Sequence, residues 1–474
     1  MRTLSFPLKR FAAGVLLLSL FGQGCSTAVD PAAVAATKPK EITIWGVIDD
    51  ESVYDPMITD YRKLHPNVTV NYRNFRLEEY EGQLLNALAE DRGPDIFLIH
   101  NTWVGKYLPK ISAMPTSVQN VVYQASGNST VPVLQSQPTI SIGMFKTNYP
   151  DAVGQDFVRT VNVSPKPDVL DNEQRIVALP MSVDTLGLYV NKDLLNAAGI
   201  ATIPATWDAF QAAVRKLTKL DDSGNIVQAG AALGTSANVE RAPDILSTLM
   251  MQNGAIMAAD DGSPTFASIP PKLRGLRETP PAADALGFYT DFANPAKDVY
   301  TWNAQQPDAL RAFEQGKLAF YFGYAYDLPT IKAQAPDLNL AIAQFPQIQG
   351  NPTVNFANYW GWTVSKKSKV ADASWSLLNF MQQPEEVKKY LTAAERPAAL
   401  KSLLPDQLQD ENVGVFASQV LTSQSWYRGN DPVIADAAFN QLIDVASSTL
   451  TIEYPKILNE AADEVAQSFA RGAQ

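Results

Sequence analysis

The spacing of apolar residues predicts a repeated strand–helix order that begins near residue 41. Glu41–Val47 has the composition of a strand, and the Asp55-Pro56 pair predicts the start of the helix that follows. Residues 68–72 alternate as a strand, residues 80–88 carry apolar side chains at helical spacing, and residues 95–99 form a continuous apolar strand. Strands joined by crossover helices predict an α/β fold with a parallel sheet, whose ligand-facing loops follow the carboxyl ends of the strands.

The pattern weakens in the next part of the chain and then becomes regular again. Residues 112–175 are rich in Ser, Thr, Gln, Asn and Pro, which predicts loops and weak helices. Residues 186–190 predict a strand, Asn191 the start of a helix and Gly199 its end. Thr206 predicts the cap of a second helix. This strand–helix–turn–helix order is common in α/β proteins and does not by itself identify a function.

The N-terminus has the pattern of an export signal. Three basic residues precede an apolar stretch at residues 11–21, which is too short to span a bilayer comfortably. The only cysteine, Cys25, follows directly and resembles the lipobox cysteine of bacterial lipoproteins, which is lipidated and becomes the mature N-terminus. We therefore expect residues 1–24 to be a signal peptide, residues 25–40 a tether, and the exported protein to be anchored to the cell membrane by its lipid. The alternative is an ordinary secretory signal with an incidental cysteine.

Length and charge narrow the classes of function. More than 430 residues follow the expected tether, which is too many for one core and predicts at least two domains. The formal net charge of −11 argues against a nucleic-acid partner. A single cysteine excludes an internal disulfide framework, and no second apolar run resembles a membrane span. Signatures of metalloproteases, serine hydrolases, P-loop proteins and dinucleotide-binding proteins are missing from the sequence.

Six segments match, in order, the pattern of a known family. They are Ile42–Gly46, Leu88–Ile96, Ala178–Leu195, Pro204–Phe210, Phe313–Ala319 and Tyr359–Lys366. The chain thereby resembles the extracellular solute-binding proteins of ABC importers, in the large sugar-binding family that includes maltose-binding protein. The resemblance extends from about residue 41 to about residue 470. An apparent insertion near residues 272–283 departs from it.

The resemblance implies an α/β, two-lobed type II periplasmic-binding-protein fold with a ligand cleft and a hinge between the lobes. Matched by position, lobe 1 would hold residues 41–182 and 340–392, and lobe 2 residues 183–339 and 393–474. Such a protein captures a sugar or oligosaccharide and delivers it to the permease subunits of an ABC transporter. It is expected to be a monomer without catalytic residue, cofactor or metal.

The candidate ligand-binding residues combine aromatic rings with carboxylates and amides. Sugar rings have apolar C–H faces and a rim of hydroxyl groups, so a sugar cleft needs planes for stacking and hydrogen-bonding partners. These groups follow predicted strands or stand at positions that the resemblance assigns to the cleft. They are Trp45, Asp49, Asp50, Asn101, Trp103, Asp184, Tyr324, Asp327, Tyr359 and Trp360.

Other interpretations stay open at this point. Trp103 and Tyr324 are also typical of core packing, and Asp184 of a structural acid that pairs with a helix end. A secreted glycoside hydrolase also needs paired acids in an aromatic cleft, and Asp49, Asp184 and Asp327 are among the acids that could supply them. The acidic balance would also suit a binding protein for another solute, such as a polyamine.

Overall fold

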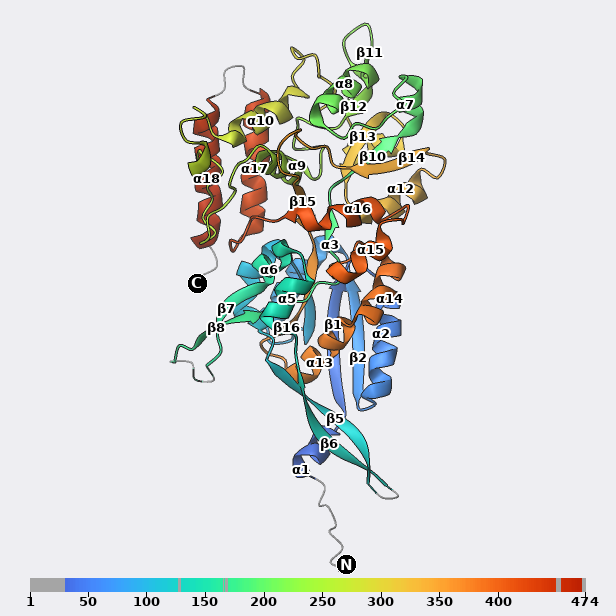
Figure 1. Ribbon diagram of the computed structural model, residues 1–474, viewed down its shortest axis with the longest axis vertical. Helices are drawn as coiled ribbons and strands as arrows, with labels where there is room; N and C mark the ends of the chain where they lie inside the picture. The colour runs from blue at the N-terminus through green and yellow to red at the C-terminus, as the bar shows by residue number, and fades with distance from the viewer. Residues whose placement is uncertain (1–29, 127–128, 165, 167–168, 449–452, 471–474) are drawn as a thin grey trace, which may run out of the picture.

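The computed structural model describes residues 30–126, 129–164, 166, 169–448 and 453–470, so the predicted signal peptide and Cys25 lie outside the described residues. The molecule is elongated, with two α/β lobes that follow one another along its long axis (Figure 1). Each lobe has its own main sheet and its own cluster of buried apolar side chains. The prediction of a two-lobed α/β fold is therefore confirmed.

The first lobe is built on a five-stranded mixed sheet. β1 (Lys40–Val47) is parallel to β2 (Val68–Phe75) and to β3 (Ile96–His100), whereas β16 (Trp360–Ser365) is antiparallel to β3 and to β4 (Ile111–Ser112). The first four residues of β3 are buried, as expected for a central strand. The α-helices of this lobe are α1 (Pro31–Ala36), α2 (Glu51–Leu64), α3 (Leu77–Ala89), α4 (Val104–Tyr107), α5 (Ile142–Asn148), α6 (Asp151–Phe157), α13 (Ala371–Met381), α14 (Pro384–Ala394) and α15 (Leu404–Gln407).

The second lobe has a five-stranded sheet of a different order. β13 (Leu318–Gly323) is parallel to β12 (Ile226–Ala231) and antiparallel to β10 (Gly187–Asn191), β10 pairs with β14 (Leu340–Gln344), and β11 (Lys219–Leu220) closes the edge. All residues of β10 and β13 are buried. The α-helices of this lobe are α7 (Lys192–Ala197), α8 (Trp207–Leu217), α9 (Ala242–Gln252), α10 (Pro281–Asp291), α11 (Ala309–Glu314), α12 (Leu328–Gln334), α17 (Pro432–Ser448) and α18 (Tyr454–Ala470).

Three short strands join the lobes and form the hinge. β15 (Asn355–Asn358) lies between β17 (Ser423–Gln424) and β9 (Asp184–Thr185) in a three-stranded sheet. α16 (Gly414–Gln419) packs against β9. The fully buried Asn355 side chain bonds the backbone N–H and C=O of Leu186, both at 2.9 Å, and so ties two crossings together.

The lobe boundaries differ from those predicted at residues 340 and 393. β14 pairs with β10 in the second sheet, so residues 340–344 belong to lobe 2. Leu400 and Leu403, which follow residue 393, are buried in the core of lobe 1, so this segment belongs to lobe 1 and not to lobe 2. The second and third crossings therefore lie at β15 and β17, whereas the first lies near the predicted residue 183.

Local sequence signals explain several elements of lobe 2. The Thr206 hydroxyl caps α8 by accepting a bond from the Ala209 amide at 3.4 Å, as predicted. The Asn191 side chain caps α7 in the same way, and Gly199 has φ +67° where the chain leaves that helix. These agree with the predicted starts and end of the two helices.

The predicted start of α2 at Asp55-Pro56 is wrong. The helix begins at Glu51, with Asp50 as its N-cap, and Pro56 lies inside it. Tyr54 and Met57, together with the residues one turn further along, are buried at helical spacing. Because this face is buried, the helix begins before Pro56, so the proline does not stand in the first turn, where it is best tolerated.

The prediction of loops and weak helices for residues 112–175 is also wrong in large part. This region contains a long hairpin of β5 (Ser117–Ser126) and β6 (Ser129–Pro138), which projects from lobe 1 (Figure 1), and a second hairpin of β7 (Val158–Asn162) and β8 (Asn172–Ile176). Val118 is buried in the core of lobe 1 and anchors the base of the first hairpin, and Val121 on the same strand is also buried. The polar composition of its other positions concealed the strands.

Much of the predicted tether is part of the folded body. α1 packs against β6, and Ala33 is fully buried. The Asn67 side chain donates bonds to the carbonyl groups of Ala36 and Lys38, at 3.1 and 3.2 Å. In the described part of the chain, no helix has the length and apolar character needed to cross a membrane.

Candidate functional site

A cavity of about 690 Å³ lies between the two lobes. Lobe 1 contributes the segments that follow β1 and β3 and the start of β16. The hinge strand β15, the start of α9, the segment before α17 and α17 itself form the opposite side. The carboxyl ends of the parallel strands β1 and β3 thus lead into the cavity, as is usual for ligand sites on such sheets.

Aromatic rings form much of the cavity wall. On lobe 1, the rings of Trp103 and Trp360 meet edge to face, with centroids 5.0 Å apart and planes at 75°. Both side chains are half-buried, so each keeps a ring surface exposed to the cavity. Tyr326, Phe356 and Trp426 line the facing side. The cavity therefore offers flat apolar surfaces on both sides of a bound molecule.

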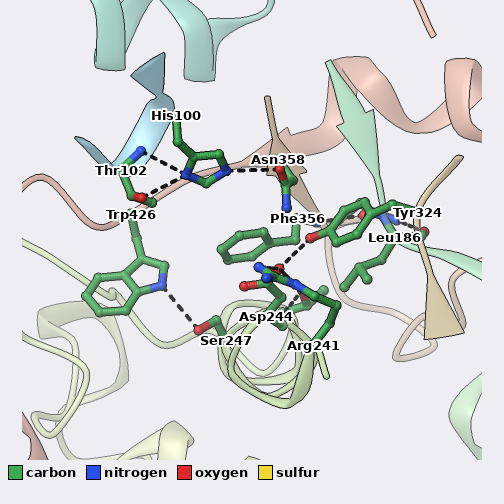
Figure 2. Close-up of polar contacts among 12 residues, drawn as sticks. His100, Thr102, Leu186, Arg241, Asp244, Ser247, Tyr324, Phe356, Asn358 and Trp426 are labelled. Carbon is green, nitrogen blue, oxygen red and sulfur yellow. Dashed lines mark hydrogen bonds and ion pairs between the residues drawn. The ribbon is translucent and has the colours of Figure 1, made fainter. Parts of the chain in front are cut away.

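An acid–arginine pair sits at the start of α9. Asp244, only 4% exposed, accepts bonds from Arg241 Nε at 2.8 Å and from the Tyr324 hydroxyl at 2.6 Å (Figure 2). The Arg241 guanidinium also lies 5.7 Å from the centre of the Tyr324 ring. A buried carboxylate requires such partners. Fully buried Tyr324 therefore supports Asp244 and does not line the cavity itself.

His100 joins the two wall segments of lobe 1 and the hinge. Its Nε2 lies 3.0 Å from Asn358 Oδ1, and its Nδ1 lies 2.8 Å from Thr102 Oγ1 (Figure 2). Burial lowers the pKa of His100 to about 4, so the ring is neutral at neutral pH. Across the cavity, Trp426 Nε1 donates to Ser247 Oγ at 3.2 Å. These bonds hold the wall side chains in fixed orientations.

A second acid–arginine pair, Asp49 and Arg396, lines a small pocket together with Trp360. Asp49 Oδ1 is 3.4 Å from Arg396 Nη2, and Asp49 Oδ2 accepts a bond from the Tyr390 hydroxyl at 2.9 Å. Asp49 and Arg396 each have side chains only 11% exposed. The pair links the loop after β1 to the segment after α14, next to the hinge.

Asp184 lies at the floor of the cleft, in a pocket of about 50 Å³ that shares Trp360 and Arg396 with the main cavity. Its Oδ1 accepts bonds from the amides of Thr185 and Ala325, at 2.9 and 3.1 Å. Asp184 Oδ2 and Arg396 Nη1 are buried and have no hydrogen-bond partner in the described part of the chain. Burial raises the pKa of Asp184 to about 6, although Arg396 opposes that shift.

The ten predicted site residues fall into three groups. Those that line the main cavity are Asp49, Asp50, Trp103 and Trp360. Those that line only the floor pocket are Asp184 and Tyr359. Those that line neither are Trp45, Asn101, Tyr324 and Asp327.

Residues in the third group have structural partners instead. The Trp45 ring packs on Phe75, with centroids 4.6 Å apart. The Asn101 side chain donates to buried Asp156 at 3.3 Å. Asp327 accepts a bond from the Tyr324 amide at 3.0 Å, and burial raises its pKa to about 7. A position just after a strand brings a residue to the cleft edge of the sheet but does not determine which way its side chain points.

Sequence reasoning missed several polar residues of the cavity. Glu240, Arg241 and Asp244 stand at the start of α9, Asp436 on α17 and Arg396 after α14. Their only sequence signal was a charged residue at or near a helix end. Charges at helix ends are common on solvent-exposed surfaces, so this signal does not single out a site.

Comparison with known proteins identifies the family. The profile of the family described as bacterial extracellular solute-binding protein matches residues 45–388, which is more than half of the chain. The chain belongs to this family. A protein of Brucella abortus (strain 2308) named as a binding protein is 27% identical over 235 residues, which are 47% of this chain and 50% of that protein. The match thus spans about half the length of the curated relatives.

Solved structures agree with this solute-binding protein over nearly its whole length. A cyclo/maltodextrin-binding protein complexed with maltotetraose has a TM-score of 0.68 and 16% identity, and covers 92% of this chain and 99% of its own. A cyclic alpha-maltosyl-1,6-maltose binding protein from Arthrobacter globiformis has a TM-score of 0.67 and 19% identity, with 92% and 100% coverage. The fold of the solute-binding protein is therefore the type II periplasmic-binding-protein fold, as predicted.

The chemistry available in the cleft is hydrogen bonding, ion pairing and stacking. Two arginines, several carboxylates and the Asn358 amide line it beside the aromatic rings. In the ranges that the structure describes, no group of three or more His, Cys, Asp or Glu side chains is arranged to hold a metal ion. A volume of about 690 Å³ is within the range typical of small-molecule sites.

Proposed function

We propose that this solute-binding protein captures an oligosaccharide between its lobes and delivers it to the permease of an ABC importer. The observation that supports the proposal most directly is the wall of the interlobe cavity, where the rings of Trp103 and Trp360 face Phe356 and Trp426. Rings on both sides suit the apolar faces of sugar rings, while acids and amides suit the hydroxyl rim. Of the similar solved structures, one is complexed with maltotetraose and another is a cyclic alpha-maltosyl-1,6-maltose binding protein.

The surroundings of Asp49, Asp184 and Asp327, which the sequence offered as acids of a hydrolase, favour binding over hydrolysis by these residues. A glycoside hydrolase needs two carboxyl groups free to act on either side of the bond that is cut. Asp49 is already paired with Arg396, and Asp327 accepts two bonds within lobe 2. Asp184 is buried on the floor with its Oδ1 bonded to two amides. We therefore propose a binding protein that leaves its ligand intact.

We further propose that the protein works outside the cytoplasm and is held at the membrane by a lipid on Cys25. The family is extracellular by its description, which supports export. The lipid anchor rests on the sequence pattern around Cys25 alone. The membrane would thus keep the binding protein close to the permease that receives its ligand.

A ligand-panel thermal-shift screen tests the proposed function. The panel contains maltotetraose, other neutral oligosaccharides, amine-bearing oligosaccharides and the polyamine spermidine. A ligand that binds only the folded state must raise the unfolding temperature, and we expect at least one saccharide to do so. Saccharides that bind should be recovered intact by chromatography after long incubation. A shift by spermidine alone, or release of new reducing ends, would contradict the proposal.

A further inference from the structure

The cavity carries more negative charge than its arginines balance. Among the described residues that line the cavity, the only arginines are Arg241 and Arg396, and there is no lysine. Six acids line the same cavity, and they come from both lobes. These acids are Asp49, Asp50, Glu81, Glu240, Asp244 and Asp436.

Half of these acids have a cationic partner and half do not. Asp49 pairs with Arg396, Asp244 pairs with Arg241, and Glu81 pairs with a lysine at 2.8 Å. In the described part of the chain, Asp50, Glu240 and Asp436 make no ion pair, and Asp50 accepts a bond from an asparagine. On the lobe 2 side of the cavity, the lining carboxylates without an ion pair are therefore Glu240 and Asp436, and both side chains are exposed.

The surroundings of Asp436 disfavour its negative charge. The Asp436 side chain is exposed and lines the cavity. Loss of solvation is the main effect that raises the pKa of Asp436 to about 6, repulsion from Asp244 adds to it, and Arg241 opposes it. A positive charge that entered the cavity beside Asp436 would reverse this penalty.

The cleft floor also has an unused acceptor. Asp184 is 6% exposed, and its Oδ2 has no partner in the described part of the chain. It lines the pocket that adjoins the main cavity. The carboxylates of floor and wall therefore suit a ligand that supplies hydrogen-bond donors, while Arg396 Nη1 on the floor suits an acceptor on the same ligand. A neutral sugar hydroxyl donates one bond, whereas a protonated amine donates up to three and carries the balancing charge.

We propose that the bound oligosaccharide carries protonated amino groups, which lie against the carboxylates of Glu240 and Asp436 on the lobe 2 side of the cavity. This inference rests on the proposed function and specifies its ligand class. Aromatic walls retain the sugar rings, while the two unpaired carboxylates select the amine. A purely neutral oligosaccharide leaves both carboxylates without a countercharge.

A matched ligand pair tests the inference by calorimetry on the whole exported body. The glucosamine tetramer and its N-acetylated counterpart have the same linkage and differ in the amine charge. Measured at about pH 6, on the acid side of the pKa of the amino groups, the glucosamine tetramer should bind at least ten-fold more tightly. Raising the salt concentration should narrow the difference because the contact is electrostatic. Maltotetraose serves as a second neutral ligand.

Two neutralising variants locate the amine. Asp436→Asn and Glu240→Gln should each lower the ratio of the two affinities by about ten-fold, as expected for loss of one charge-assisted contact. Asp463→Asn, on the exposed side of α18 and away from the cavity lining, is the matched control and should leave the ratio unchanged. Equal or tighter binding of a neutral tetramer would overturn the inference and leave the proposed function intact. A ratio unaffected by both variants would overturn the assignment to lobe 2.

Discussion

Trp103 and Trp360 present two nearly perpendicular ring surfaces to the cavity. Their edge-to-face contact has the geometry that aromatic quadrupoles favour, and His100 packs against Trp360 with ring centroids 5.2 Å apart. Since Trp103 also stacks on Tyr107, at 5.7 Å between centroids, neither ring is free to turn. Rigid side chains lose little conformational entropy when a ligand stacks on them, which favours their use as binding surfaces.

Removing the Trp360 ring should weaken ligand binding without unfolding the protein. We expect Trp360→Ala to lose about 1 to 3 kcal/mol of affinity for the saccharide that the screen identifies, in line with the loss of a large buried ring contact. Calorimetry gives the affinity, and circular dichroism checks the fold. Tyr123→Ala, an exposed aromatic on the β5–β6 hairpin, is the control. Unchanged affinity in both Trp360→Ala and Trp103→Ala would place the ring contacts elsewhere.

Asp327 should make the protein less stable as the pH rises. Burial raises its pKa to about 7, compared with about 3.9 in the unfolded chain. Between these values the folded state holds a proton that the unfolded state has lost, so the free energy of unfolding falls with pH, by up to about 1.4 kcal/mol per unit. The neutral side chain of Asp327→Asn lacks this slope.

Urea unfolding at about pH 4, 6 and 8 measures the effect. Relative to the wild type, Asp327→Asn should gain about 1 to 3 kcal/mol of stability between the lowest and the highest pH. The exposed Asp463→Asn change is again the control. Parallel pH curves for the wild type and Asp327→Asn would show that Asp327 is already ionised in the folded protein at low pH.

Among the elements, α2 shows how tertiary burial overrides a local signal. Its buried face includes Tyr54, Met57, Ile58 and Tyr61, so the helix must start before Pro56 for Tyr54 to reach the core. Pro56 itself is exposed and cannot donate a bond to the carbonyl of Ser52. The helix therefore contains a local defect on its solvent side.

Replacing Pro56 distinguishes the two possible helix starts. With the helix starting at Glu51, Pro56→Ala restores a backbone bond and should raise the free energy of unfolding by about 1 to 3 kcal/mol. With a start at Asp55, the proline would occupy the favourable first position and its loss would give no gain. Pro384→Ala, at the first position of α14, is the matched control and should not stabilise the protein. Urea unfolding of both variants makes the measurement.

Elements with strong local signals were predictable, and those that depend on distant contacts were not. The side chains of Thr206 and Asn191 cap the backbone amides at the starts of α8 and α7, so these helix starts could be predicted from the residue type alone. The β5–β6 hairpin is polar on most of its positions, and only contacts with lobe 1 bury Val118. β14 joins the second sheet by pairing with β10, about 150 residues earlier in the chain, which no local pattern indicates.

The same reasoning explains what could be predicted of the site. Trp103 and Trp360 lie in motifs at strand ends, and both line the cavity. Arg241 and Asp436 reach it from the starts of two helices that are far apart in the sequence. Only the packing of lobe 2 brings these two residues together. That they line the same cavity as the lobe 1 tryptophans could therefore not be predicted from the sequence.

At the scale of the whole molecule, the N-terminal connection matters for anchoring. α1 begins at Pro31 and packs on the hairpin strand β6, at the end of lobe 1 far from lobe 2 (Figure 1). Only five residues separate Cys25 from Pro31, so a lipid on Cys25 would keep α1 within roughly 20 Å of the membrane. The anchored protein would then be held close to the bilayer.

Removing the lipid attachment site should release the protein. We expect Cys25→Ala to leave the body folded and to move it from the membrane to the soluble fraction, because lipid chains would supply the attachment. Fractionation with a high-salt wash measures the distribution, and the thermal-shift response to ligand confirms that the body is folded. Retention of the variant in the membrane fraction would contradict the lipid anchor.

The hinge should allow the lobes to close over the ligand. β9, β15 and β17 are two, four and two residues long, and they carry the chain between the two cores. Short crossings of this kind absorb a rotation while the cores stay rigid. The cavity walls belong to different lobes, so a ligand that contacts both favours the closed arrangement.

Closure predicts a smaller radius of gyration when a saturating saccharide is added, which small-angle X-ray scattering measures. The change should be absent with a non-binding sugar from the same panel, which controls for the effect of solute on the scattering contrast. Trp360→Ala should show the same decrease only at a higher ligand concentration, because the variant loses affinity and keeps the hinge. A radius that stays constant at saturation, with binding verified by calorimetry, would mean that the lobes are already closed before the ligand arrives.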